Sequence, residues 1–381
     1  MRDRQPGTVV IGGGQAGLAV GYHLRRRRLP CVILEEHARV GDVWRKRWDS
    51  LRLFTPARYN GLPGMRFPEP PSSYPTKDDA AAYLEAYTRE FNLPVRTGVK
   101  VERLSRVGDG FEVICGERTL WAENVVVATG AYHNPSVPPF APDLDESIVQ
   151  LHSREYRNPS QIREGGVLVV GAGNSGAEIA IELAPRNRTW LSGRYTGQEP
   201  TRAGSFADQL FTPVLWLLAT RVLTVKTPLG RKVRDQFLDP PRGIPLARVR
   251  RKDFAASRIE RVPRVTGARN GCPLLEDGRV LEVSNVIWCT GFTPSYDWIE
   301  LALPSRSGLP IQERGVVDSC PGLYFVGLPF LHSLSSALLG GVGRDAKHVV
   351  DHIVSARLGI FRHAPDSYDG AAPAAGGPRV A

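Results

Sequence analysis

The stretch "VGAGNSGAEIAIELA" runs from Val170 to Ala184, and a similar stretch, "IGGGQAGLAVGYHL", runs from Ile11 to Leu24. Both carry the glycine spacing G-x-G-x-x-G between a short apolar run and a segment with helical spacing. In such a unit the first glycine permits a tight turn, the second lets a pyrophosphate approach the backbone, and the third lets the helix pack against the strand. The helix N-terminus then attracts the phosphates. The sequence therefore predicts two dinucleotide sites.

The first unit predicts a buried strand at residues 8–14, a helix over 15–28 and a second strand at 31–36. Glu35, at the end of that second strand, lies 18 residues after Gly17, the last glycine of the loop. A carboxylate at this place can accept hydrogen bonds from both hydroxyls of an adenosine ribose, so the site suits FAD or NAD. The residues assigned to it are Gly12, Gly14, Gln15, Ala16, Gly17, Glu35 and Glu36.

The second unit carries its glycines at Gly171, Gly173 and Gly176, and the same count of 18 residues after Gly176 reaches Arg194. A ribose with a 2′-phosphate would repel a carboxylate and pair with a guanidinium, so this site suits NADPH better than NADH. Ser192 could add a hydrogen bond. The alternative, that Arg194 is simply one arginine of an arginine-rich chain, stays open at this point.

Two such sites in one chain favour a particular pair of cofactors. Nicotinamide cofactors do not usually react with each other, whereas NADPH passes hydride readily to a flavin, so we expect FAD at the first site and NADP at the second. Two further strands, "NVVVATG" (124–130) and "NVIWCTG" (285–291), end in small residues that suit a close approach to a dinucleotide. From these strands and from "GLYFVGL" (322–328) we add Thr129, Gly130, Thr290, Gly291 and Gly327 to the cofactor contacts.

The chain at this point resembles the flavin-containing monooxygenases, which are class B flavoprotein monooxygenases, and is similar in pattern to YUCCA-type enzymes and to related bacterial FAD/NADP-binding flavoproteins. The resemblance covers about residues 8–353, where the family's segments occur in order, among them "SLRLFTPARYNGLPGMRFP", "YPTKDDAAAYLEAY", "ATGAYHNPSVP", "HSREY" and "CTGFTPSYDWI". It implies that Trp44 lies against FAD. It also implies that Tyr74, Thr76, Asn174 and Ser175 lie near NADP.

The family's identifying pattern F-x-G-x-x-x-H-x-x-x-[WYF] is only half kept. His152 and Tyr156 match it, whereas Glu146 and Ile148 stand in place of the phenylalanine and the glycine. Some relatives carry an asparagine near the flavin where this chain has Pro56, as YUCCA-like sequences do. This departure weakens the case for animal-type S- and N-oxygenation.

The predicted fold is α/β, with two nested Rossmann-like dinucleotide-binding domains, because the family places an NADP domain inside an FAD domain. We expect the FAD-binding domain at residues 1–145, the NADPH-binding domain at 146–291, and the return segment of the FAD domain at 292–360. Residues 361–381 have the composition of a disordered tail.

Several classes of protein are disfavoured by composition. The chain has 49 Lys+Arg against 39 Asp+Glu, but no nucleic-acid motif accompanies this charge, so we expect no nucleic-acid partner. The five cysteines (Cys31, Cys115, Cys272, Cys289 and Cys320) form no C-x-x-C pair and no metal-ligand spacing, which argues against a metal site and against a disulfide reductase. The first residues carry charge and lead directly into a strand, so we expect no signal peptide and a cytoplasmic protein.

The region from residue 201 to 275 is the least readable. The apolar run at 211–225 is interpreted as a buried or substrate-lining helix, with attachment to a membrane surface as the alternative. Residues 221–264 carry thirteen Lys+Arg against four Asp+Glu, which is often only a solvated surface but could attract an anionic cofactor or an acidic substrate.

These observations, taken with the resemblance, imply an NADPH- and O2-dependent monooxygenase that oxygenates a small organic substrate through a C4a-peroxyflavin. Heteroatom oxygenation, Baeyer–Villiger insertion and oxidative decarboxylation of a 2-oxo acid are the candidate reactions. No catalytic acid or base is assigned, because the flavin carries the chemistry. The alternatives are an FAD-dependent NADPH oxidase or reductase and a non-catalytic, flavin-bound regulatory protein. A homodimer is compatible with the sequence.

Overall fold

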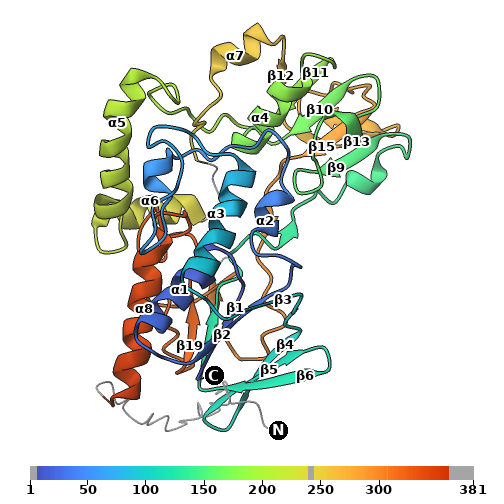
Figure 1. Cartoon of the computed structure of the whole chain (residues 1–381). Helices are drawn as coiled ribbons and strands as arrows, with labels where there is room; N and C mark the ends of the chain where they lie inside the picture. The colour runs from blue at the N-terminus through green and yellow to red at the C-terminus, as the bar shows by residue number, and fades with distance from the viewer. Residues whose placement is uncertain (1–6, 239–243, 307, 360–381) are drawn as a thin grey trace, which may run out of the picture.

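Two five-stranded parallel sheets organise the computed structural model, which describes residues 7–238, 244–306 and 308–359. The first sheet has the strand order β19-β7-β1-β2-β3, and the second has the order β12-β11-β10-β15-β9. The two sheets lie toward opposite ends of the molecule (Figure 1). The fold is therefore mixed α/β, as predicted. Residues 361–381, the predicted tail, lie outside the described residues.

The first sheet consists of β1 (Thr8–Ile11), β2 (Cys31–Glu35), β3 (Val95–Thr97), β7 (Asn124–Val127) and β19 (Leu323–Phe325). Its three inner strands, β7, β1 and β2, are largely continuous apolar runs because both of their faces are covered. Val10 packs into a core with the helices α1 (Gln15–Arg26), α3 (Lys77–Glu90) and α8 (Val342–Arg357). Val9 and Ile11 point to the opposite face, toward an antiparallel sheet of β4 (Arg103–Val107), β5 (Gly110–Cys115) and β6 (Arg118–Ala122).

The second sheet repeats this layering. It consists of β9 (Val149–His152), β10 (Val167–Val170), β11 (Thr189–Ser192), β12 (Glu260–Val262) and β15 (Asn285–Trp288). Val167 and Val169 face α4 (Asn174–Leu183) and α7 (Arg251–Ala256), whereas Leu168 and Val170 face the hairpin of β13 (Val265–Arg269) and β14 (Cys272–Leu275). Each glycine stretch therefore links the central strand of a sheet to a helix on one face of it.

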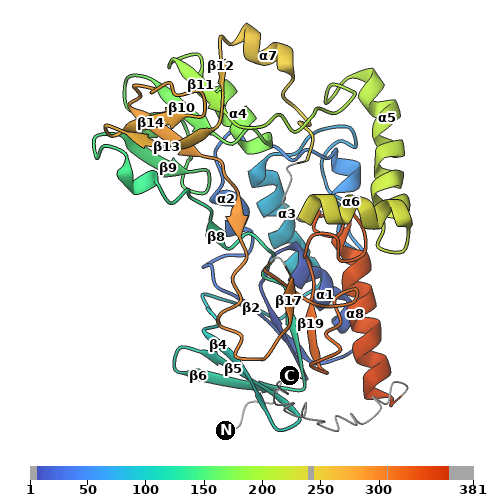
Figure 2. The ribbon, with the colours of Figure 1, turned by 180° about the vertical axis from the view of Figure 1, so that it is seen from behind.

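The chain completes the second sheet before it completes the first. All strands of the second sheet lie between residues 149 and 288, and β19 then pairs with β7 of the first sheet. The chain passes between the two sheets twice, and these two passages pair with each other. They form a two-stranded antiparallel ladder of β8 (Asn134–Pro135) and β16 (Phe292–Thr293), which lies between the two sheets (Figure 2).

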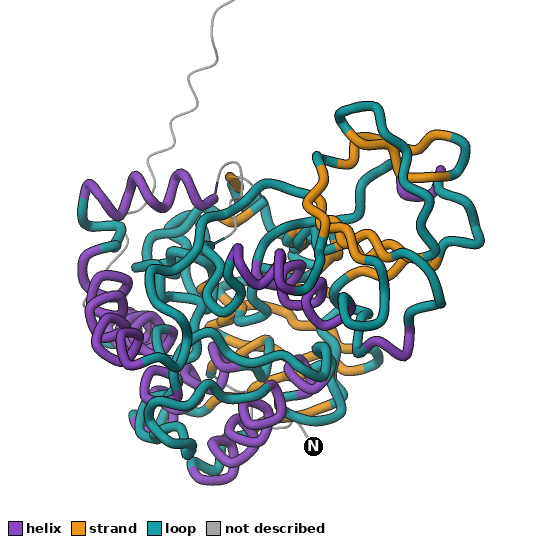
Figure 3. Tube along the Cα trace, turned by 90° about the horizontal axis from the view of Figure 1, so that it is seen from above, coloured by secondary structure: helices purple, strands orange, loops and turns teal. Residues whose placement is uncertain are grey.

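Short helices and coil complete the structure. Residues 40–75 contain only α2 (Asp42–Arg45) and the 3-10 helix η1 (Ala57–Tyr59). Two further 3-10 helices are η2 (Ala141–Asp143) and η3 (Pro159–Gln161), and β17 (Ser305–Arg306) pairs with β18 (Leu309–Pro310). Seen from above, the helices gather along one side of the molecule and much of the second sheet and its hairpin projects on the other (Figure 3).

The apolar run at 211–225 does not form a buried helix, so this part of the prediction is wrong, whereas a substrate-lining role stays a prediction. It lies in α5 (Phe206–Leu217), in the π-helical turn η4 (Leu218–Val222) and in the loop before α6 (Pro228–Leu238). In α5 the buried residue is Asp208, whereas Leu210 and Leu217 are 64% and 56% exposed. Apolar spacing predicts a helix but does not say which face other elements will cover.

A pH-dependent stability follows from Asp345 in α8. This residue is 1% exposed, its Oδ1 has no hydrogen-bond partner among the described residues, and burial raises its pKa from 3.8 to about 6. The folded protein favours the protonated carboxyl, so the contribution of Asp345 to stability is fully present below pH 3.8 and is lost as the pH rises through about 6.

Asp345→Asn should therefore raise the free energy of unfolding by about 3 kcal/mol at about pH 8 and by much less at about pH 4. Denaturant unfolding at both pH values measures this. Asp351→Asn, on the same helix, is the control, because Asp351 is partly exposed and paired with Lys347, and its loss should give no gain at the higher pH. A gain of equal size at both pH values for Asp345→Asn would contradict the assignment.

Candidate functional site

In the first glycine loop, two glycines are tightly packed and one, at the start of the helix, faces open space. Gly12 has φ +108°, and a Cβ there would lie 2.7 Å from the carbonyl oxygen of Ala128. A Cβ on Gly17 would lie 1.9 Å from the carbonyl oxygen of Gly12, so α1 can pack this closely only with glycine at that position. A Cβ on Gly14 would meet nothing within 4 Å, and no side chain caps α1 at Gly14. The free N–H groups of the first turn therefore face open space, as a pyrophosphate requires.

The second loop has the same geometry. Gly171 has φ +110°, and a Cβ there would lie 2.1 Å from the carbonyl oxygen of Cys289. A Cβ on Gly176 would lie 1.8 Å from the carbonyl oxygen of Gly171. Gly173 again has nothing within 4 Å of its Cβ position, and no side chain caps α4 there. The two loops therefore have equivalent backbone geometry. We call the loop of residues 12–17 with the start of α1 the first cradle, and the loop of residues 171–176 with the start of α4 the second cradle.

The other predicted glycines lie at the ends of neighbouring strands. Gly130 and Gly291 have φ +77° and +86°, and both have nothing within 4 Å of their Cβ positions. Gly327 also has a positive φ, and a Cβ there would lie 2.8 Å from Cβ of Ala16 at the start of α1. These positions border the first and second cradles from the side of the next strand.

The threonines beside these glycines hold the strand ends in place. The Thr129 hydroxyl lies 3.1 Å from Nε2 of His133, and the Thr290 hydroxyl donates a hydrogen bond to the carbonyl of Ser136. Gln15, at the start of α1, contacts the C-terminal part of the chain: its Nε2 donates to the carbonyl of Ala337 at 3.4 Å.

Glu35 is buried beside the first loop. Its Oε2 accepts a hydrogen bond from the backbone N–H of Gly13 at 2.7 Å, and its Oε1 accepts from the backbone N–H of His37 at 2.9 Å. Nδ1 of His37 also lies 2.6 Å from Oε1. These contacts fix the carboxylate against the loop and leave it lone pairs for further donors. The side chain of Glu36 is 53% exposed.

Arg194 is exposed just beyond the second loop, and the structure gives it no hydrogen bond or ion pair with any described residue. The preceding Gly193 packs against that loop, because a Cβ there would lie 2.9 Å from the backbone nitrogen of Ala172. Arg261 donates to the carbonyl of Gly193 at 2.7 Å, and Arg251 lies over the ring of Tyr195. Burial, together with the charge of Arg251, lowers the pKa of Arg261.

The sequence did not single out Arg251 and Arg261, whose side chains contact Tyr195 and Gly193, the two neighbours of Arg194. The only signal was the positive charge of residues 221–264, which did not say which arginines the fold brings beside Arg194. Ser192 is fully buried, and its hydroxyl donates to the carbonyl of Pro263 at 2.8 Å. Its contact with the cofactor stays a prediction.

Three of the residues implied by resemblance have structural partners. Thr76 caps α3, where its hydroxyl accepts from the backbone N–H of Asp79. Asn174, half-buried like its neighbour Ser175, accepts from the N–H of Ala247 at 2.9 Å. The hydroxyl of Tyr74 donates to Oδ2 of Asp208 at 2.5 Å, and burial followed by this carboxylate raises the pKa of Tyr74.

Trp44 in α2 is half-buried and packs against the core of the first half. Its indole Nε1 is buried and has no hydrogen-bond partner among the described residues. A buried indole N–H without an acceptor is costly, so this donor fits a contact with a bound group.

The half-kept family pattern also has a structural role. Nε2 of His152 lies 3.0 Å from the carbonyl oxygen of Gly291, and the hydroxyl of Tyr156 donates to Glu182 at 2.8 Å. His152 therefore supports the strand end that borders the second cradle.

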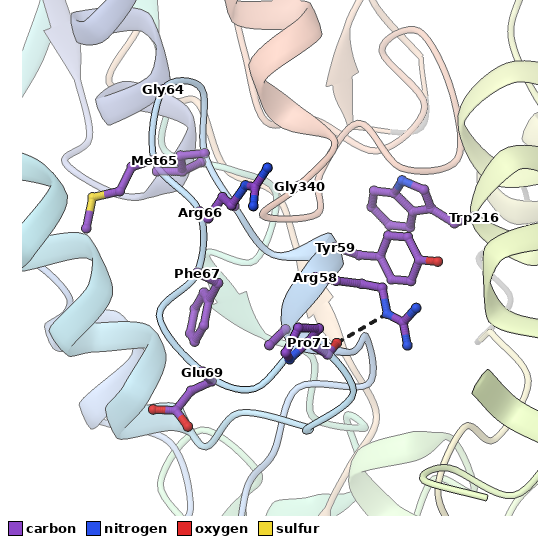
Figure 4. A pocket seen from close by; sticks show the side chains of 13 residues that line it. Arg58, Tyr59, Gly64, Met65, Arg66, Phe67, Glu69, Pro71, Trp216 and Gly340 are labelled. Carbon is purple, nitrogen blue, oxygen red and sulfur yellow. Dashed lines mark hydrogen bonds between the residues drawn. The ribbon is translucent and has the colours of Figure 1, made fainter. Parts of the chain in front are cut away.

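A cavity of about 670 Å³ lies between the coil of residues 57–71, Trp216 of α5 and Gly340 (Figure 4). The rings of Tyr59 and Trp216 stack at one side of it, with centroids 5.0 Å apart, and Arg58 donates to the carbonyl of Pro71. None of the residues assigned to the cofactors lines this cavity, so it is separate from both cradles.

No other kind of site emerges from the described residues. All five cysteines are free, and no group of histidine, cysteine and carboxylate side chains in the described ranges could hold a metal ion. Among the same residues, no helix combines the length and the apolar character needed to cross a membrane.

Two glycines of the second loop are expected to have different roles, Gly176 in helix packing and Gly173 in the approach of a ligand. Gly176→Ala should lower the melting temperature, because its Cβ would overlap the carbonyl of Gly171. Gly173→Ala should leave the melting temperature nearly unchanged but weaken dinucleotide binding about tenfold or more, because the added methyl enters the open cradle. Thermal unfolding and dinucleotide titration measure the two effects. Equal affinity in Gly173→Ala and the unaltered protein would show that no ligand approaches this loop.

Comparison with known proteins places these features in a family. A family model described as pyridine nucleotide-disulphide oxidoreductase matches residues 9–196. An uncharacterized CzcO-like oxidoreductase of Geobacillus kaustophilus is 40% identical over 350 residues, which cover 91% of this chain and 98% of the relative. The indole-3-pyruvate monooxygenase YUCCA4 of Oryza sativa subsp. japonica is 31% identical over 407 residues, with coverage of 92% and 87%.

A solved structure of a flavin monooxygenase is also similar to this chain. The flavin-containing monooxygenase from Stenotrophomonas maltophilia aligns with a TM-score of 0.71 at 29% identity, covering 92% of this chain and 98% of that one. The match extends over both glycine cradles and over nearly the whole length of each relative. On these grounds the chain belongs to the flavin-containing monooxygenase family.

Proposed function

We propose that this chain is an NADPH- and O2-dependent flavoprotein monooxygenase that oxygenates a small organic substrate, with FAD at the first cradle and NADP at the second. The observation that carries the proposal is the contrast between two cradles of equal backbone geometry. The first has the buried carboxylate of Glu35 beside it, and the second has the exposed guanidinium of Arg194. This difference suits one plain ribose and one ribose that carries a 2′-phosphate.

At the first cradle, the N–H groups at the start of α1 would bind the pyrophosphate of FAD, and Glu35 would accept from the adenosine ribose. Gln15, Ala16, Gly130 and Gly327 would line the path of the cofactor. Trp44 would offer its buried and unpartnered N–H to the bound group. We assign this role to the first sheet and its helices, that is, to residues 1–145 and 292–360.

At the second cradle, α4 would bind the pyrophosphate of NADP through its free N-terminal N–H groups. Arg194 would pair with the 2′-phosphate, with Arg251 and Arg261 adding positive charge around it. We assign this role to residues 146–291, which gives two nested Rossmann-like domains. Thr290 and Gly291 border this cradle, and His152 holds the carbonyl of Gly291.

Bound FAD supplies hydride acceptance and the activation of O2. The chain would contribute binding, orientation and the exclusion of water, for which no side-chain acid or base is required. The five cysteines of the sequence include no C-x-x-C pair, the arrangement that is typical of disulfide oxidoreductases.

Arg194→Ala tests the identity of the second cofactor. Loss of a charge-assisted contact to the 2′-phosphate should raise KM for NADPH about tenfold to a hundredfold and leave KM for NADH nearly unchanged. Arg188→Ala is the matched control, because Arg188 is also exposed near the second sheet but stacks on Trp190. An unchanged ratio of the two KM values in Arg194→Ala would contradict the assignment.

Rapid mixing tests the proposed reaction. The purified yellow protein should be reduced by NADPH without oxygen, and mixing with oxygenated buffer should then give a spectral species distinct from both oxidised and reduced flavin. That species should persist while NADP is bound and decay faster when a substrate is added. Ketones, sulfides, amines and 2-oxo acids should be screened for oxygenated product against NADPH consumed.

The outcome decides between the proposed activity and its rivals. Direct return to oxidised flavin, with one peroxide released for each NADPH consumed and no effect of any substrate, would support an NADPH oxidase. Flavin that is bound but never reduced by NADPH would support a non-catalytic regulatory protein.

A further inference from the structure

The helix α5 and the turn η4 (residues 206–222) have an inverted arrangement of polar and apolar side chains. A helix on the surface of a globular protein normally buries its apolar face and exposes its polar face. Here the buried residues are Asp208 in α5 and Thr220 in η4. Trp216 packs on Tyr59, but most of the large apolar side chains of the same segment are exposed.

These exposed side chains form a continuous stripe along the helix. Phe206 is 77% exposed, Leu210 64%, Val214 49% and Leu217 56%, and they recur at intervals of three or four residues. We call the following set of exposed residues the apolar stripe: Phe206, Leu210, Phe211, Val214, Leu217 and Leu218. A contiguous apolar surface of this kind marks a site of contact with another molecule or with a membrane. In Figures 1 and 2 α5 lies at the periphery of the molecule.

The inner side of the helix explains why it stays in this orientation. Asp208 accepts hydrogen bonds from the hydroxyl of Tyr74, from the N–H of Gly204 and from the hydroxyls of Thr201 and Thr212. Rotating α5 to bury the apolar stripe would break the bonds from Tyr74, Thr201 and Gly204, which lie outside the helix, and would leave polar groups unpaired, which is costly. The stripe is therefore held facing outward by a polar anchor.

The charges around the stripe are mostly positive. Five cations in residues 201–238 are exposed, namely Arg202, Arg221, Lys226, Arg231 and Lys232, and Asp208 is buried. The exposed Asp235 of α6 is paired with Arg234. An exposed helix with phenylalanine and leucine on its outer face, flanked by cations, has the character of a segment that lies in the interface of an anionic membrane.

We propose that the apolar stripe and its flanking cations bind this protein to the surface of a bilayer that contains anionic phospholipids. The side chains of Phe206, Leu210 and Leu217 enter the boundary between headgroups and acyl chains, and the cations contact lipid phosphates. The bilayer is favoured over a second copy of the chain, because a two-fold interface centred on the stripe would bring the same cations of both copies together. An anionic surface neutralises them.

Vesicle flotation of the full-length, FAD-containing protein tests the proposal. At low salt the protein should float with vesicles of phosphatidylcholine and phosphatidylglycerol but much less with phosphatidylcholine alone. The double variant Leu210→Asp/Leu217→Asp should lower the partition coefficient about tenfold or more. The triple variant Lys226→Gln/Arg231→Gln/Lys232→Gln should lower it about fivefold for each charge removed, with a smaller effect at high salt.

Ile311→Asp is the matched control, because Ile311 is an equally exposed apolar residue outside this region, at 54%. It should bind vesicles as the unaltered protein does, and all variants should retain FAD and their melting temperature. Equal binding to neutral and anionic vesicles, no binding to either, or unchanged binding of the double aspartate variant would overturn the proposal. A dimer that dissociates only in the double aspartate variant would assign the stripe to a second copy and would also overturn it.

Discussion

The structure depends on how closely a helix can approach the loop from which it starts. In each half, the third glycine of the loop places its Cα against the carbonyl of the first, at Gly17 against Gly12 and at Gly176 against Gly171. This contact brings the helix N-terminus onto the carboxyl end of the central strand, because no Cβ stands between them. The neighbouring strands then end at the same edge, and the open glycines Gly14 and Gly173 lie there. One steric constraint, used twice, therefore creates both cradles.

The sequence was sufficient to predict features that depend on residues close together in the chain. The glycine spacing predicted both strand–loop–helix units. One residue in each, 18 residues after the last glycine of the loop, distinguished them: Glu35 in the first unit and Arg194 in the second. What the sequence could not predict depends on contacts between distant residues. Arg261 reaches Gly193 only because β12 pairs with β11, and Ser192 points inward because the strand alternates its side chains. The domain boundaries and the role of each cofactor residue stay predictions.

The segment from 206 to 222 shows another limit of sequence reasoning. The apolar run at 211–225 was predicted to be a helix, and α5 and η4 cover most of it, but the orientation of α5 is set by Asp208 and by partners such as Tyr74, more than a hundred residues earlier. A buried carboxylate with four donors outweighs the tendency of the apolar face to turn inward, because unpaired polar groups are costlier to bury than single leucines are to expose. Hydrophobicity alone therefore gave the wrong face.

The late return of β19 to the first sheet has a consequence for biosynthesis. The second sheet is drawn from one uninterrupted stretch of chain, so it can form on the ribosome as soon as that stretch has emerged. The first sheet must wait for residues 323–325, and α1 must wait for α8, which packs against it. During this interval β7 has an unpaired edge and α1 an uncovered apolar face, the features that chaperones recognise and that lead to aggregation. The half of the molecule that begins first is therefore the half that matures last.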